Sequence, residues 1–153
     1  MKVYRFETKQ VLPVSKTKCW EFFSDPKNLQ IMTPPELDFK IKSILPGEMY
    51  PGQIIIYRIK IFPLIYVTWV TEITHVRDYE YFVDEQRFGP YKLWHHEHIF
   101  REVNEGVEMT DIVHYAIPLG LIGRIMNAIV IKKKLNRIFS FRKEFLKSSL
   151  NKS

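Results

Sequence analysis

Apolar and polar residues alternate with a period of two along much of this chain. Residues 2–12 place Tyr4, Phe6 and Thr8 on one face and charged side chains on the other. Successive side chains of a strand point to opposite faces, so this pattern predicts a half-buried strand. The same alternation predicts further strands at residues 38–44, 53–62, 65–76 and 107–117.

Residues 81–100 predict two more strands, joined at Gly89-Pro90. On the second of them, the period of two puts Trp94, His96, His98 and Phe100 on one face. Two aromatic rings and two imidazoles are unusual for a face in solvent. If this face points inward, its polar groups need partners or water, which a ligand cavity supplies and a dry core does not.

Sequence signals for helices occur near both ends of the chain. Ser15 is a suitable N-cap for a helix that reaches Phe23, and Asp25-Pro26 ends that helix and can open a shorter one near residues 27–32. A long helix is predicted from about residue 121 to residue 149 after Pro118-Leu119-Gly120. Its expected apolar stripe comprises Ile125, Ala128, Ile129, Ile131, Leu135, Ile138, Phe139, Phe145 and Leu146.

The element order is one strand, two short helices, six strands and a long final helix. A single helix of that length, roughly 40 Å at 1.5 Å per residue, must lie across a whole sheet. We therefore predict an α+β fold in which a strongly curved antiparallel sheet of about seven strands wraps around the C-terminal helix. We expect residues 1–153 to form a single ligand-binding domain.

Composition supports a folded chain, with 46% apolar and 14% aromatic residues. The formal net charge of +6 is concentrated in the last fifth of the sequence. Without a groove-reading motif we expect no nucleic-acid binding, and we interpret the basic segment as a solvated helix face with possible weak contact to an anionic membrane surface. Its basic residues are Lys132, Lys133, Lys134, Arg137, Arg142, Lys143, Lys147 and Lys152.

A cytoplasmic location is the default expectation. Cys19 is the only cysteine, which rules out an intramolecular disulfide and fits a reducing compartment. The first seven residues alternate in polarity and lack the apolar run of a signal peptide.

The candidate functional residues are the polar and aromatic groups predicted to face inward. Carboxylates and imidazoles enclosed together are costly unless they hydrogen-bond each other, so we expect an Asp–His–Asp network. That network either orients a ligand or stabilises the fold. Asp84 and Gln86 join it only if the hairpin register aligns even-numbered positions of both strands. The candidate set is Trp69, Asp84, Gln86, Trp94, His96, His98, Asp111 and Tyr115.

Metal and cofactor chemistry is not expected. His96-x-His98 with Asp84 or Asp111 could supply donors for zinc or iron, but His-x-His is a short pattern, and no further carboxylate or cysteine stands at a diagnostic spacing. The sequence also lacks a glycine-rich phosphate loop, a nucleophile elbow and a dinucleotide fingerprint.

The element order and several segments of the sequence resemble the START-like superfamily, also called SRPBCC or the helix-grip fold, so the resemblance implies an α+β helix-grip fold. The segment from Leu12-Pro13-Val14 through Trp20-Glu21-Phe22-Phe23 to Asn28-Leu29 is similar to the start of many bacterial members, including polyketide-cyclase-like and coenzyme-Q-binding groups. Asp84-Glu85-Gln86, Gly89-Pro90-Tyr91, Trp94-His-His-Glu-His98 and Asp111-Ile-Val-His-Tyr115 resemble one bacterial subgroup more closely. The resemblance implies a hydrophobic cavity between the sheet and the final helix, but no single activity, because members carry or transfer lipids, sense hormones, or assist polyketide cyclisation.

The resulting expectation is a binding protein for a small or medium hydrophobic ligand, such as a lipid, an isoprenoid or a polyketide-like compound. The alternative is a cyclase or hydratase that uses His96 or His98, poised by Asp84 or Asp111, as a general acid or base. The sequence leaves binding and turnover open. The expected apolar walls are Phe39, Ile55, Tyr57, Val67, Trp69 and Ile129.

Overall fold

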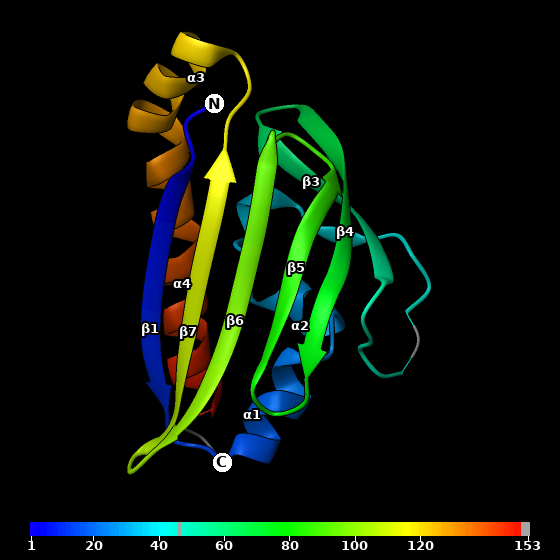
Figure 1. The fold of residues 1–153 in the computed structure, drawn as a ribbon, viewed down its shortest axis with the longest axis vertical. Helices are drawn as coiled ribbons and strands as arrows, with labels where there is room; N and C mark the ends of the chain where they lie inside the picture. The colour runs from blue at the N-terminus through cyan, green and yellow to red at the C-terminus, as the bar shows by residue number, and fades with distance from the viewer. Residues whose placement is uncertain (46, 151–153) are drawn as a thin grey trace.

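In the computed structural model, which describes residues 1–45 and 47–150, one antiparallel sheet of seven strands curves around the C-terminal helix (Figure 1). The strand order is β1-β7-β6-β5-β4-β3-β2. Five hairpins therefore connect neighbours in sequence, and only β1 pairs with a distant strand. The strands are β1 Tyr4–Leu12, β2 Lys40–Ile41, β3 Gln53–Phe62, β4 Ile65–Arg77, β5 Tyr81–Phe88, β6 Leu93–Val103 and β7 Gly106–Ala116.

The turn between β6 and β7 requires glycine. Gly106 has a φ of 132°, and a Cβ added there would lie 2.1 Å from the carbonyl oxygen of Leu12. Only a residue without a side chain allows β1 to approach the turn this closely. The pairing of β1 with β7 starts at this point, with Leu12 opposite Val107, and runs to Tyr4 opposite Tyr115.

Two short helices cover one end of the sheet. They are α1, Lys16–Phe23, and α2, Lys27–Ile31, followed by a single 3-10 turn, η1, Pro35–Leu37. The predicted N-cap is confirmed, because Ser15 Oγ accepts a hydrogen bond of 3.2 Å from the backbone N–H of Lys18. The ring of Trp20 packs edge-on against Phe82 and Phe100, which anchors α1 to β5 and β6.

The long helix is interrupted by a π turn. It comprises α3, Gly120–Met126, the π segment η2, Asn127–Ile131, and α4, Lys132–Leu150. A π turn adds a residue and so shifts the face that a helix presents to the sheet. Asn127 is consequently buried, while Ile125 and Ile129 are 54% and 59% exposed. Ala128 is exposed as well, so the expectation that Ile125, Ala128 and Ile129 belong to the buried stripe, with Ile129 a wall of the cavity, is wrong.

Two further expectations need correction. The strand predicted at residues 38–44 shrinks to Lys40–Ile41, although Phe39 beside it is buried as expected. Arg142, predicted on the solvated basic face, is buried with 6% exposure. Lys134 is half-buried, whereas Lys132, Lys133, Arg137, Lys143 and Lys147 are exposed. Lys152 lies outside the described residues.

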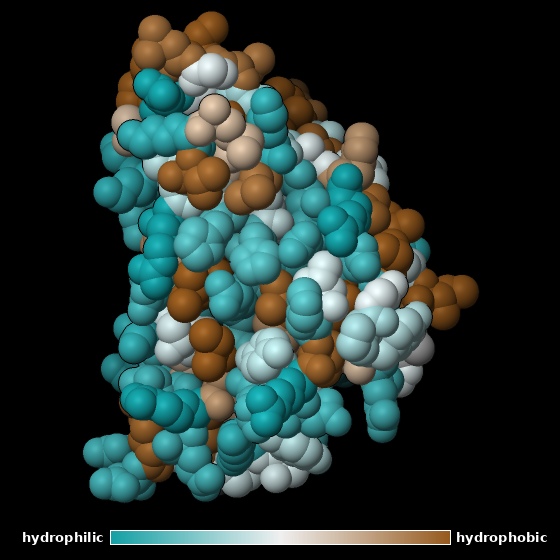
Figure 2. Space-filling view, in the orientation of Figure 1, coloured by the Kyte–Doolittle hydropathy of each residue, from teal (hydrophilic) through white to brown (hydrophobic). Residues whose placement is uncertain are grey.

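The outer face of the sheet is mostly polar, as the alternation predicts, and apolar surface gathers over α3 at the top of the molecule (Figure 2). The exposed apolar residues there are Leu119, Leu121, Ile122, Ile125 and Ile129. Among the described residues, no helix is long and apolar enough to cross a membrane.

Candidate functional site

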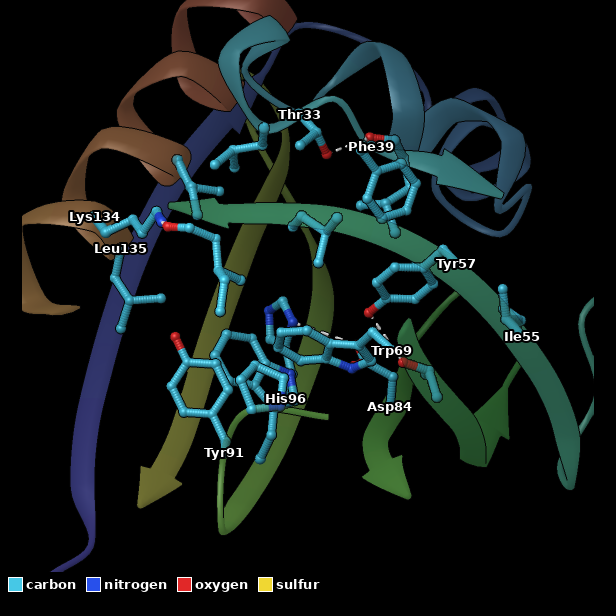
Figure 3. Close-up of a pocket in the computed structure, with 18 of the residues that line it drawn as sticks. Thr33, Phe39, Ile55, Tyr57, Trp69, Asp84, Tyr91, His96, Lys134 and Leu135 are labelled. Atoms are coloured by element: carbon cyan, nitrogen blue, oxygen red, sulfur yellow. Dashed lines mark hydrogen bonds and ion pairs between the residues drawn. The ribbon is translucent and has the colours of Figure 1, made fainter. Parts of the chain in front are cut away.

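A cavity of about 320 Å³ lies between the concave face of the sheet and α4 (Figure 3). Tyr57 on β3 and Trp69 on β4 line it from the sheet, and Leu135 lines it from the helix. Its solvent-exposed lining residues are Phe62, Pro118 and Leu119, so the cavity opens between the β3–β4 turn and the start of α3. This size and apolar lining suit a small ligand.

An aromatic chain forms one wall of the cavity. The ring of Tyr57 lies 4.6 Å from Phe39 and 5.8 Å from Trp69, measured between centroids. Trp69 in turn meets the edge of Trp94 at 5.2 Å, and Trp94 lies 4.9 Å from Tyr91. These contacts hold the rings in place before any ligand arrives, and preorganisation of this kind lowers the entropic cost of binding.

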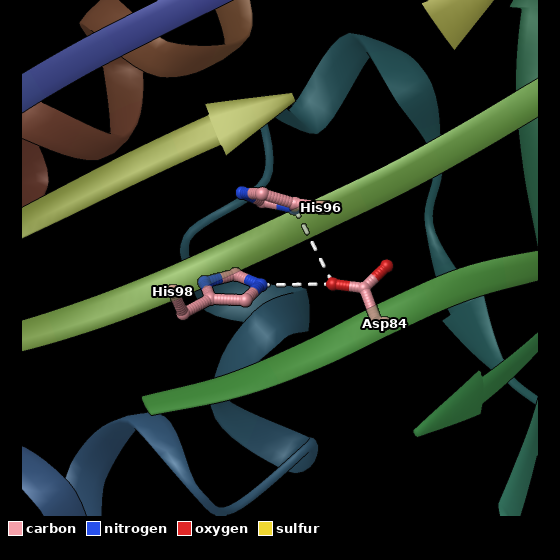
Figure 4. A group of neighbouring side chains, drawn as sticks. All are labelled: Asp84, His96 and His98. Atoms are coloured by element: carbon pink, nitrogen blue, oxygen red, sulfur yellow. Dashed lines mark hydrogen bonds and ion pairs between the residues drawn. The ribbon is translucent and has the colours of Figure 1, made fainter. Parts of the chain in front are cut away.

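A four-residue network closes the polar end of the cavity. Strand register creates it, because Asp84 on β5 lies opposite His96 on β6, and His98 on β6 lies opposite Asp111 on β7. Asp84 Oδ2 lies 2.8 Å from His98 Nε2 and 3.3 Å from His96 Nδ1 (Figure 4). Asp111 Oδ1 lies 2.9 Å from His96 Nε2 and 3.1 Å from His98 Nδ1. The predicted Asp–His–Asp arrangement is therefore present.

His96 and the two carboxylates of the network shift each other's pKa values in opposite directions. Burial alone lowers the pKa of His96, but the carboxylates of Asp84 and Asp111 outweigh burial and raise that pKa to about 9. Burial alone raises the pKa of each carboxyl, but contacts with His96 and His98 outweigh it and hold both pKa values well below the ordinary range. Near neutral pH, His96 is an imidazolium between two carboxylates.

Arg142 is the main residue of the site that the sequence interpretation missed. This side chain reaches from α4 to the cavity, and its Nη1 lies 3.9 Å from Asp111 Oδ1. The guanidinium carbon also lies 4.9 Å from the ring centre of Phe139. Helical spacing could have predicted that Arg142 is buried, because it stands three residues after Phe139 and four before Leu146, and both of these lie on the buried stripe.

The predicted site residues divide into two groups. Those lining the cavity are Trp69, Asp84, Trp94, His96 and His98. The others, Gln86, Asp111 and Tyr115, are outside the described lining. Of the expected walls, Phe39, Ile55, Tyr57 and Trp69 line the cavity, whereas Val67 does not. A direct role in ligand binding stays a prediction for every member of the candidate set.

The side chains of Gln86 and Tyr115 form hydrogen bonds to neighbouring segments of the chain. The Gln86 amide donates to the Tyr91 carbonyl at 2.7 Å and accepts from the Tyr91 N–H at 3.1 Å, which fixes the turn between β5 and β6. The hydroxyl of Tyr115 donates to Asn127 Oδ1 at 2.8 Å. The π turn places Asn127 on the inner face of the helix, and this bond ties η2 to β7.

The Asp84, His96 and His98 side chains could hold a divalent metal, since their candidate ligand atoms lie within 4.8 Å of one another. A metal needs a neutral imidazole, whereas the carboxylates raise the pKa of His96 to about 9. A metal would therefore have to displace a proton at neutral pH. The expectation of no resident metal or cofactor stays a prediction.

Comparison with known proteins supports the fold. No known family model matches the sequence, and no curated protein does either. Solved structures do match over almost the entire chain. Protein CV1439 from Chromobacterium violaceum is similar with a TM-score of 0.71 at 14% identity, over 96% of this chain and 97% of that one. TTHA0849 from Thermus thermophilus is similar with a TM-score of 0.69 at 12% identity, over 95% of this chain and 99% of that one.

A third similar structure is Ara h 8.0201, with a TM-score of 0.62 at 16% identity, over 97% of this chain and 100% of that one. At these identities the likeness concerns the fold alone. The chain has an α+β helix-grip fold, with its curved seven-stranded sheet and long C-terminal helix.

Proposed function

We propose that this protein binds a small or medium hydrophobic molecule in the cavity between the sheet and α4. The observation that carries the proposal is a cavity of about 320 Å³ whose walls are mainly apolar and aromatic, closed by one polar network. Burial of the ligand's apolar surface would supply most of the affinity, at roughly 25 cal/mol per Å² before ordering costs. Lipids, isoprenoids and polyketide-like compounds share this combination of an apolar body and a polar end.

Filling the cavity from its helical side tests the proposal. Ile131 lines the cavity from η2 and is half-buried, so Ile131→Trp should occupy ligand space without breaking the core. We expect the affinity for the neutral fluorescent probe N-phenyl-1-naphthylamine to fall at least tenfold, or about 1.4 kcal/mol, in a fluorescence titration.

The matched control is Ile129→Trp, because Ile129 is exposed two residues earlier on the same helix. This variant should bind the probe as the parent protein does. A parent protein that does not bind the probe, or an Ile131→Trp variant with unchanged affinity, would contradict the proposed cavity function.

Catalysis by a cavity histidine is the alternative function. A general base needs a ring nitrogen that is free to take a proton from the substrate. Both ring nitrogens of His96 lie within 3.3 Å of a carboxylate, and that imidazole carries a proton near neutral pH. This arrangement favours a role in orienting a ligand over a role as a base, so we place binding before cyclase or hydratase activity.

Contact with an anionic membrane surface is a second candidate function. Leu119, at the open end of the cavity, lies next to the exposed apolar residues of α3. Arg124 on α3 is exposed, as are Lys132 and Lys133 at the start of α4. Apolar side chains for the acyl boundary beside basic side chains for the headgroups are the features of an interfacial helix.

Vesicle binding checks this candidate. Ile122→Glu on α3 should weaken co-sedimentation with phosphatidylserine-containing vesicles about fivefold, because it buries a charge and repels anionic lipid. Ile54→Glu, at another exposed isoleucine on β3, should bind as the parent does. Equal losses in both variants, or no preference for anionic over neutral vesicles, would count against membrane contact through α3.

A further inference from the structure

Arg142 is a buried cation with almost no partners of its own. Its side chain is 8% exposed, and it makes no hydrogen bond to any described residue. Its one ion pair within the described part of the chain, with Asp111, has an N···O distance of 3.9 Å, which is too long for a hydrogen bond. Buried guanidinium groups normally satisfy several of their five N–H donors, so Arg142 has unused capacity to bind an acceptor.

The histidines already occupy one oxygen of each nearby carboxylate, and neither Asp84 nor Asp111 makes a hydrogen bond to Arg142. Asp111 Oδ1 accepts from His96 Nε2 at 2.9 Å, and Asp84 Oδ2 lies 2.8 Å from His98 Nε2. The remaining carboxylate in the described lining, Asp25, accepts from the backbone N–H of Lys27 at 3.0 Å. The guanidinium therefore faces a cavity in which each of these carboxylates already shares one oxygen with another residue and none hydrogen-bonds to Arg142.

A second donor in the cavity is also unpaired. Trp69 Nε1 is buried and has no hydrogen-bond partner among the described residues, and the indole lines the same cavity as Arg142. Lys134 adds another cation to the lining, and its ammonium group donates to the Ile61 carbonyl. Two unpaired donors, one of them charged, call for a ligand that brings acceptor oxygens and negative charge.

We propose that the ligand of this cavity is a carboxylic acid with an apolar body, whose carboxylate binds the guanidinium of Arg142. This inference rests on the proposed binding function and specifies its ligand class. A planar carboxylate matches the fork of N–H donors on arginine, and the aromatic wall of the cavity receives the apolar body. Ligands of the same length with a neutral or a cationic end lack this match.

Competition against the neutral probe N-phenyl-1-naphthylamine measures this preference. Decanoate and decanol have the same chain length and differ in the charged end, so their ratio of inhibition constants isolates the headgroup. We expect decanoate to bind the parent protein at least tenfold more tightly than decanol, and decyltrimethylammonium to compete least. In Arg142→Met the ratio of decanoate to decanol affinity should fall close to one, while decanol affinity changes less than about twofold.

Two comparisons separate charge from structure. Arg137→Met removes the same charge from an exposed position on α4 and should leave the ratio at the parent value. Arg142→Lys keeps the charge but loses the fork, so it should retain part of the preference. If Arg142→Met does not fold, Arg142→Lys takes its place, and a ratio equal to that of the parent would then overturn the role of the Arg142 guanidinium.

The possible results test the carboxylate preference separately from the proposed binding of hydrophobic molecules. Tight probe binding with equal affinity for decanoate and decanol in the parent would overturn the carboxylate inference and leave the hydrophobic cavity standing. An equal loss of decanoate and decanol binding in Arg142→Met would also overturn it, because the residue would then shape the cavity only. Failure of the neutral probe to bind would instead overturn the proposed function.

Discussion

Replacing Asp111 with asparagine should lower the free energy of unfolding by roughly 3–5 kcal/mol, the usual cost of removing one partner from a buried charge network. Asp111 is 4% exposed, and its Oδ1 faces His96 and His98 at 2.9 and 3.1 Å and Arg142 at 3.9 Å. The substitution keeps the size of the side chain but leaves a buried imidazolium and a buried guanidinium with one carboxylate fewer. Urea unfolding monitored by circular dichroism measures the change.

Asp78→Asn provides the comparison for Asp111→Asn, because Asp78 is exposed in the turn between β4 and β5. The same chemical change there should alter stability by less than about 0.5 kcal/mol. If Asp111→Asn lowers the free energy of unfolding by less than about 1 kcal/mol, the prediction that the network stabilises the fold is wrong.

Stability should fall as the pH rises from about 6.5 to about 9. The pKa of His96 is raised from 6.5 to about 9 in the folded protein, so its contribution is complete below pH 6.5 and is lost as the pH passes through 9. A shift of that size corresponds to roughly 3 kcal/mol. Asp84 and Asp111 have lowered pKa values, so their contribution is present above about pH 4 and is lost in acid.

The expected optimum therefore lies between about pH 4 and pH 6.5, and urea unfolding at fixed ionic strength from about pH 3 to about pH 9 locates it. His96→Gln should flatten the alkaline slope, even if the variant is less stable at every pH. A parent protein whose stability stays constant between pH 6.5 and 9 would show that His96 does not hold its proton in the folded state.

Period-two alternation was sufficient to predict most of the sheet. It placed β1, β3, β4 and β7 within a few residues, because each has one buried and one solvated face. It overestimated β2, since Phe39 is buried beside the strand and not in it. It also could not predict the π turn, which arises from tertiary contacts such as the Tyr115–Asn127 hydrogen bond rather than from periodicity.

Strand alternation likewise predicted the Asp–His network, because His96, His98 and Asp111 sit on inward faces of neighbouring strands. The position of Asp84 depended on hairpin register, which the structure confirms by pairing it with His96. Gln86 follows the same numbering, but its amide turns to the backbone of Tyr91, a local hydrogen bond that alternation cannot predict. Arg142 was assigned to the surface by its charge, although its helical spacing placed it on the buried stripe.

The pairing of β1 with β7 has a consequence for biosynthesis. In the described sheet β7 is the only neighbour of β1, so during synthesis β1 waits for its partner until about one hundred further residues have been made. Exposed strand edges attract other chains. Three of the four outward-facing residues of β1 are charged, Arg5, Glu7 and Lys9 beside Val11, and these charges disfavour pairing with a neighbouring nascent chain during that interval.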